Sequence, residues 1–120
     1  MTKEKGQKEQ KEKLLEDLLK QTAETTTLDF KREIELSSDK DKNEFAKDVS
    51  AFANTRGGYM VFGKEDRREG GRIVGIRRET FNSEQMQQII SRKCYPPVRF
   101  EAELVQLDSK WFVLLKVSES

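Results

Sequence analysis

The chain has 120 residues, of which 34% are hydrophobic and 38% are charged, and 23 basic against 22 acidic side chains give a net charge of +1. This length allows one domain with one core, and no apolar run is long enough to span a bilayer. With no His and a single Cys, His-based catalytic triads, disulfide frameworks and zinc sites are excluded. We therefore expect a soluble, cytoplasmic protein without zinc or haem, in which any catalysis depends on carboxylates, Lys, Arg, hydroxyls or a hard metal ion.

The first 36 residues predict a polar tail, a helix and a strand. Residues 1–13 carry five Lys and three Glu. We expect them to form a solvated tail, with a nucleic-acid-binding arm as the alternative, and residues 14–120 to form a single domain. Leucines at helical spacing predict an amphipathic helix over about 8–22. Alternating apolar residues predict a strand over 28–36, with a break at Arg32 as one option.

The middle of the chain predicts a second helix and a pair of strands. A helix from Asp41 to about Thr55 is indicated by a capping-box pattern that Glu44 completes and by apolar residues at helical spacing. A Gly-Gly pair then ends this helix. The apolar run 59–63 predicts a strand buried on both faces, and 72–76 predicts its hairpin partner across a charged turn.

The last third of the chain predicts a helix followed by two strands. The helix begins at Asn82 or Ser83 and ends near Cys94, where a Pro-Pro pair blocks its continuation. Strands follow over 98–107 and 111–117. The order α-β-α-β-β-α-β-β predicts an α+β domain with a mixed, largely antiparallel sheet and packed helices. Because the sequence ends just beyond the last strand, a fragment of a longer protein is one interpretation.

Arginine is concentrated in one part of the sequence. Residues 56–99 hold eight of the nine Arg and have ten basic against five acidic residues, a net charge of +5. The guanidinium group offers a planar fork of donors that matches phosphate. We therefore expect an anion-facing surface, with ordinary surface ion pairs as the alternative. The candidate nucleic-acid-binding residues are Arg56, Arg67, Arg68, Arg77 and Arg78.

Three carboxylates and one lysine form a candidate catalytic site. Asp29 and Lys31 share a face of the first predicted strand, Glu24 precedes that strand, and Asp66 follows the next one. If the two strands are neighbours, Glu24, Asp29 and Asp66 would hold Mg²⁺ or Mn²⁺ and Lys31 would stabilise charge, which suits phosphodiester hydrolysis without His. Four unrelated surface charges are the alternative, and spacing alone favours that alternative.

Several segments resemble the AlbA-like domain of the Schlafen family over about residues 24–117. They are LDFK at 28–31, SAFANTRGG at 50–58 and VGI at 74–76, together with Gly63 and Pro97. The resemblance implies a DNA- or RNA-binding domain of the kind found in microbial transcriptional-regulator-like proteins. It also implies that metal-dependent endoribonuclease activity is an option, because some Schlafen proteins cut tRNA and rRNA. No G-x-x-x-x-G-K-[ST] motif is present, so we expect no ATP site.

The nuclease motif of the family matches the candidate site. The resemblance implies an acid, a second acid five residues later, a basic residue two positions further and a third acid after the glycine-rich strand. Glu24, Asp29, Lys31 and Asp66 occupy these positions, although an Asp replaces the expected second Glu and Glu65 is an alternative third acid. The nuclease members carry two facing lobes and a zinc site, whereas this chain has one lobe and no zinc ligands. A homodimer would supply the second lobe.

These observations lead to two functional hypotheses. The first is a nucleic-acid-binding domain for RNA or DNA, extended to metal-dependent cleavage if the acids meet around Mg²⁺ or Mn²⁺. The alternative is a non-catalytic regulatory or interaction module of a transcriptional regulator. Nucleic acid is the expected partner in the first case, no membrane is expected in either, and whether the protein is an enzyme stays open.

Overall fold

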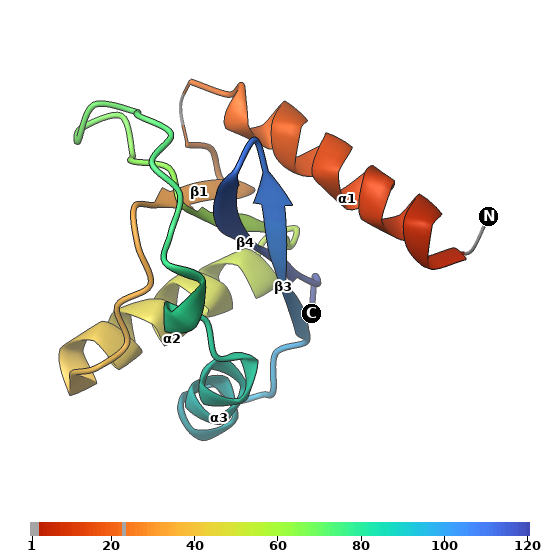
Figure 1. The fold of residues 1–120 in the computed structure, drawn as a ribbon. Helices are drawn as coiled ribbons and strands as arrows, with labels where there is room; N and C mark the ends of the chain where they lie inside the picture. The colour runs from red at the N-terminus through yellow and green to blue at the C-terminus, as the bar shows by residue number, and fades with distance from the viewer. Residues whose placement is uncertain (1–2, 23) are drawn as a thin grey trace.

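The computed structural model describes residues 3–22 and 24–120, and in it a four-stranded sheet lies between helices on both faces (Figure 1). The strand order is β1-β2-β4-β3, with β1 parallel to β2 and the other neighbours antiparallel. The predicted α+β class with a mixed, largely antiparallel sheet is confirmed. In chain order the elements are α1 (Lys3–Leu19), β1 (Leu28–Lys31), α2 (Asp39–Ala53), β2 (Gly58–Phe62), the 3₁₀ turn η1 (Arg78–Thr80), α3 (Ser83–Lys93), β3 (Phe100–Leu107) and β4 (Lys110–Val117).

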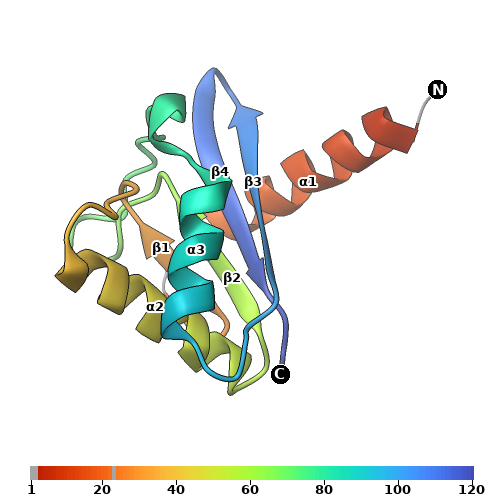
Figure 2. The same ribbon diagram turned by 90° about the horizontal axis from the view of Figure 1, so that it is seen from below.

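The sheet separates two hydrophobic cores. Side chains alternate between the faces of a strand, so Met60 and Phe62 of β2 face α2 and α3 while Val61 faces α1. Figures 1 and 2 show α1 on one side of the sheet and α2 and α3 on the other. The core beneath α2 and α3 includes Phe45, Val49, Phe52, Met86, Ile90, Val113 and Leu115, and the core beneath α1 includes Leu15, Leu19, Phe30, Phe112 and Leu114.

Two predicted boundaries move for identifiable reasons. The capping box of α2 starts at Ser38, not at Asp41, because the Ser38 hydroxyl accepts from the Asp41 amide at 3.0 Å and the Asp41 carboxylate accepts from the Ser38 amide at 3.4 Å. The helix therefore begins three residues before the predicted Asp41–Glu44 box would place its first turn. The first strand ends at Lys31 instead of residue 36, so the break expected at Arg32 is confirmed.

The predicted strand at 72–76 does not form, and the prediction of a fifth strand is wrong. The segment contributes two isolated bridges, from Lys64 to Ile73 and from Ile76 to Trp111. The Gly63 carbonyl accepts from the amides of both Val74 and Gly75, at 2.9 and 2.8 Å. Gly75 adopts a φ of +71°, so the chain turns away from β2 and Ile76 pairs with β4 instead. The one glycine of this segment, Gly75, breaks the ladder that its apolar residues suggested.

Helix α1 begins earlier and ends earlier than predicted. It covers Lys3–Leu19, so residues 3–13, which we expected to form a tail, belong to the helix; residues 1–2 lie outside the described part of the chain. Lys11 forms an ion pair with Glu103 on β3, which fixes this part of the helix over the sheet. Within the described residues, every helix is too short or too polar to cross a membrane.

The C-terminal end of α1 is held by a buried lysine. The Lys64 ammonium donates to the Leu19 carbonyl at 2.9 Å and to the Gln21 carbonyl, and it lies 4.4 Å from the centroid of the Phe30 ring. Lys64 is only 5% exposed, and burial lowers the pKa of its ammonium group. The last carbonyls of a helix have no partner within the helix and carry partial negative charge. Lys64 therefore joins the end of α1 to the end of β2.

The β3–β4 hairpin turns at Asp108 and Ser109, and Lys110, which was expected to lie in the turn between strands 98–107 and 111–117, is the first residue of β4. Asp108 and Ser109 both have positive φ, 51° and 67°, which is the backbone of a two-residue type I′ turn. The eight pairs of the ladder, from Phe100 with Val117 to Leu107 with Lys110, follow in register from this turn. The hairpin forms one half of the sheet.

Gly57 and Gly71 offer a matched test of the close approach between the start of β2 and the end of β4. Both have similar positive φ, +75° and +70°, but a Cβ at Gly57 would lie 2.5 Å from the Val117 carbonyl oxygen, whereas nothing lies within 4 Å of one at Gly71. We expect Gly71→Ala to lower the free energy of unfolding by about 1–2 kcal/mol from backbone strain alone. Gly57→Ala should lower the free energy of unfolding by clearly more, because the new Cβ would also clash with the Val117 carbonyl oxygen. Urea denaturation measures both, and equal losses would contradict the steric reading.

Candidate nucleic-acid interface

The carboxylates predicted for β1 are separately engaged. Glu24 accepts a hydrogen bond from the Phe30 amide at 3.0 Å and so satisfies a backbone donor of the edge strand. Asp29 and Lys31 share a face, as predicted, and the Lys31 ammonium lies 3.1 Å from the Asp29 carboxylate. The same ammonium lies 3.1 Å from Asp48 on α2. Lys31 therefore bridges two carboxylates, compensating one of their two charges, and links β1 to α2.

Asp66 and Glu65, the predicted third acid and its alternative, lie in different surroundings. Asp66 belongs to its own turn, because its carboxylate accepts from the Glu69 amide at 2.9 Å and the Glu69 carboxylate accepts from the Asp66 amide at 3.0 Å. Glu65 is the buried acid, only 3% exposed. It accepts from Arg72 at 2.9 and 3.0 Å and from Arg32 at 3.2 Å. The hydrogen bonds from Arg72 lower the pKa of the Glu65 carboxyl group, and burial opposes them.

The predicted metal-binding set does not fit a metal ion in this arrangement. Glu24 is bound to a backbone amide, Asp29 to an ammonium group and Asp66 to its own turn. Among residues 3–22 and 24–120, no three acidic or Cys side chains are grouped so that they could hold a metal. The structure brings Asp29 and Lys31 together and leaves Glu24 and Asp66 outside that pair.

An acidic groove lies beside Lys31, between β1 and α2. Glu33 raises the pKa of the neighbouring Glu35 carboxyl group by charge repulsion and hydrogen bonding, and Asp41 adds to the repulsion. A groove so rich in negative charge repels phosphate. The groove between β1 and α2 is therefore unfavourable for binding the phosphates of a nucleic acid. The charged residues that line this groove are Lys31, Glu33, Glu35, Asp41, Glu44 and Asp48.

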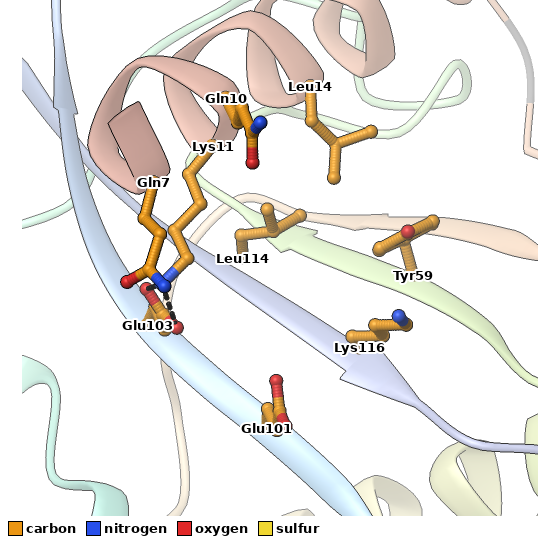
Figure 3. Close-up of a pocket in the computed structure, with 9 residues that line it drawn as sticks. All are labelled: Gln7, Gln10, Lys11, Leu14, Tyr59, Glu101, Glu103, Leu114 and Lys116. Atoms are coloured by element: carbon orange, nitrogen blue, oxygen red, sulfur yellow. Dashed lines mark hydrogen bonds and ion pairs between the residues drawn. The ribbon is translucent and has the colours of Figure 1, made fainter. Parts of the chain in front are cut away.

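A second groove, of about 360 Å³, lies between α1 and the open face of the sheet. Figure 3 shows Lys11 reaching from α1 to Glu103 on β3. Glu101 and Lys116 pair across the neighbouring strands β3 and β4. The two basic and two acidic side chains balance, so this groove gives no net attraction for an anion.

Four of the five arginines predicted to bind nucleic acid lie beyond the same end of β2. Arg67 and Arg68 are exposed in the turn that follows β2, and Arg77 and Arg78 are exposed at the start of η1, the 3₁₀ turn that precedes α3. The Arg78 guanidinium lies 5.0 Å from the centroid of the Trp111 ring at the start of β4, a cation–π contact that holds the side chain over the hairpin. Within the described part of the chain, none of these four exposed arginines takes part in an ion pair.

The fifth predicted arginine, Arg56, lies at the opposite end of the sheet. It is exposed in the turn between α2 and β2, directly before Gly57, which contacts the end of β4. The five residues of β2 separate this turn from the one that carries Arg67. From the sequence we expected all five arginines on one surface, whereas in the fold they lie at two opposite ends of the sheet.

Sequence reasoning missed two buried interactions, that of Lys64 with backbone carbonyls and that of Glu65 with Arg72. Charge counting placed Lys64 and Arg72 with the anion-facing cations, whereas the first binds helix carbonyls and the second binds Glu65. Glu65 was an alternative to Asp66 as the third acid of the predicted site. A charged turn has no hydrophobic periodicity, so the sequence does not show which of these two adjacent acids is buried.

The Glu65 network predicts a specific dependence of stability on pH. Because its folded pKa lies below the ordinary value of 4.5, the carboxylate contributes stability above that pH, and the contribution is lost as pH falls through the folded pKa. We expect Glu65→Gln to melt at a lower temperature than the wild type at pH 7 and the difference to shrink as the pH falls below 4.5. Thermal melts across this range test it, with Glu9→Gln on α1 as control. A difference that is constant with pH would contradict the assignment.

Comparisons with known proteins identify the fold and the family. The family model described as Schlafen, AlbA_2 matches residues 24–120, which leaves α1 outside the match. Among solved structures, the DIP2311 protein of Corynebacterium diphtheriae is similar, with a TM-score of 0.60 and 23% identity over 96% of this chain and 23% of that one. This chain thus spans about a quarter of that protein's length.

A second solved structure is similar to this chain, and no curated protein matches the sequence. It is the N-terminal domain of a protein of Nitrosomonas europaea described as related to the ATP-dependent DNA helicase RecG, with a TM-score of 0.50 and 21% identity over 87% of this chain and 72% of that one. At these identities the two solved structures establish the fold alone.

Proposed function

This chain belongs to the Schlafen AlbA_2 family, and we propose that it is a cytoplasmic nucleic-acid-binding domain that contacts phosphates through Arg67, Arg68, Arg77 and Arg78. The observation that carries the proposal is that these four exposed arginines have no ion pair within the described residues. A guanidinium group without a protein carboxylate keeps its donors for a phosphate. Arg32 and Arg72, by contrast, are bound to Glu65.

The surroundings of Arg77 favour this use. A shallow groove of about 240 Å³ runs between segments 32–34 and 74–77, and its charged lining residues are Arg32, Glu33 and Arg77, two basic against one acidic. The acidic groove near α2 would turn a polyanion away from β1 and toward these arginines. The similar domain of Nitrosomonas europaea comes from a protein described as related to a DNA helicase, which agrees with a partner of this class.

The proposal predicts steep, arginine-dependent sensitivity to salt. For a single strand, each phosphate contact contributes about 0.7 to the slope of log affinity against log salt concentration. We expect Arg67→Gln/Arg68→Gln and Arg77→Gln/Arg78→Gln each to reduce that slope by about 1.4. Fluorescence anisotropy with labelled single-stranded RNA, single-stranded DNA and tRNA gives the slopes.

The matched control is Lys8→Gln/Lys13→Gln, which removes the same charge from exposed positions on α1, across the sheet from α3. Its slope should stay near that of the wild type. A larger loss in this control would assign the binding to the N-terminal helix, which the sequence offered as an alternative. If nothing binds at low salt, the proposal fails and a regulatory or interaction module becomes the better hypothesis.

Metal-dependent cleavage by Glu24, Asp29 and Asp66, with Lys31 assisting, is a finer hypothesis that rests on the family resemblance. The arrangement of these side chains does not fit a bound Mg²⁺ or Mn²⁺, so we expect labelled tRNA and single-stranded RNA and DNA to stay intact with either metal. Gel electrophoresis with an EDTA arm tests this. Cleavage that needs metal and disappears in Glu24→Ala/Asp29→Ala would reverse the expectation.

The homodimer stays a prediction, which sedimentation of the purified chain would test.

A further inference from the structure

Tyr95 is the starting point, because its side chain is 97% exposed at the end of α3. Tyrosine rings are costly to leave in water and usually pack at least one face. Residues 92–99 contain three basic residues and no acid. All three, Arg92, Lys93 and Arg99, are exposed. The ring thus stands free within a cationic segment.

Arg56 joins this segment through the sheet. Val117 at the end of β4 pairs with Gly58 on one side and with Phe100 on the other. Neighbouring strands lie about 4.8 Å apart, so the starts of β2 and β3 are about 10 Å apart. Arg99 directly precedes the start of β3, and Arg56 lies two residues before the start of β2. We call Arg56, Arg92, Lys93, Tyr95 and Arg99 the Tyr95 cluster.

Helix α3 connects the Tyr95 cluster to Arg77 and Arg78. Figure 2 shows α3 running along the sheet from η1 at one end of the molecule to the loop near the C-terminus at the other. Its eleven residues span about 16 Å. Past Glu84 in its first turn, the exposed positions before the cluster are uncharged: Gln87, Gln88 and Ser91. No carboxylate on this part of the helix would repel a strand that follows it.

We propose that a single-stranded nucleic acid lies along the exposed face of α3, with its phosphates on Arg77 and Arg78 at one end and on the Tyr95 cluster at the other, and with one base stacked on Tyr95. The inference rests on the proposed function and extends it to strandedness and path. An unpaired base is required because the bases of a duplex are already stacked on one another. The path is of the order of the 4–16 nucleotides that single-strand sites occupy.

The decisive comparison is Tyr95→Ala against Tyr95→Phe. Phe keeps the ring that stacks and Ala removes it, and neither change disturbs the core because the side chain is exposed. Anisotropy should show that Tyr95→Ala weakens binding of a 15-nucleotide single strand by about five- to a hundredfold, whereas Tyr95→Phe stays within about twofold. A 15-base-pair duplex should bind both variants alike. The same titration with an RNA strand and with a DNA strand shows whether the site prefers ribose or deoxyribose.

A second readout locates the strand directly. Photocrosslinking of a 5-bromouracil-substituted strand should give a crosslinked peptide that contains Tyr95, and Arg92→Gln/Arg99→Gln should lower the salt slope by about 1.4. If the strand binds through Arg77 and Arg78 but Tyr95→Ala, Arg92→Gln/Arg99→Gln and the crosslink show no effect, the inference is overturned and the proposed function stands. If no strand binds at all, both fall together.

Discussion

Two adjacent buried charges at the end of β2 add polar links between parts of the chain that also pack through the hydrophobic core. The Lys64 ammonium binds the last carbonyls of α1, and the Glu65 carboxylate binds Arg72 across the following turn and Arg32 just after β1. Buried charges are costly unless they are paired and hydrogen-bonded, and a partner left alone is strongly destabilising. One dipeptide therefore fixes the end of a helix, the end of the edge strand and the base of a long turn.

The Glu65 network also determines which arginines face solvent freely. Arg72 and Arg32 are bound to Glu65, and binding them closes the base of the turn from which Arg67 and Arg68 project. A turn that is already closed loses less conformational entropy when a ligand orders its side chains. The acid thus prepares a cationic surface without taking part in it. The division of cations into bound and free ones matters more for binding than the net charge of the segment.

The sequence predicted those features that follow from local rules, and it failed where a partner is distant. The continuous apolar run 59–63 predicted β2 and the leucine spacing before residue 20 predicted α1, because a buried strand and a helix face are both visible in the local sequence pattern. The strand expected at 72–76 failed because Gly75 turns the chain toward Trp111, a residue far along the sequence.

The candidate site shows the same limit more sharply. Asp29 and Lys31 met as predicted, since they are two apart on one strand. The Glu24 carboxylate accepts a hydrogen bond from a backbone amide, and the Asp66 carboxylate accepts one from an amide of its own turn. The spacing of acids along the sequence carries no information about such competing hydrogen-bond donors. Of two neighbouring acids, only the fold reveals that Glu65 is the buried one.

The two-residue turn at Asp108 and Ser109 has a consequence for how the chain folds. A hairpin with so short a loop closes on the microsecond timescale, well before strands that are distant in sequence can find each other. Its register then serves as the template on which β2 docks, and a slip of one residue would turn every side chain of β4 to the wrong face. Formation of β4 within this hairpin also sets the separation between Trp111 and Val117, six residues apart on the strand, beside which the two cationic ends of the molecule lie. The spacing of a surface that would read phosphates is thus determined early in folding, by a turn that carries no cation of its own.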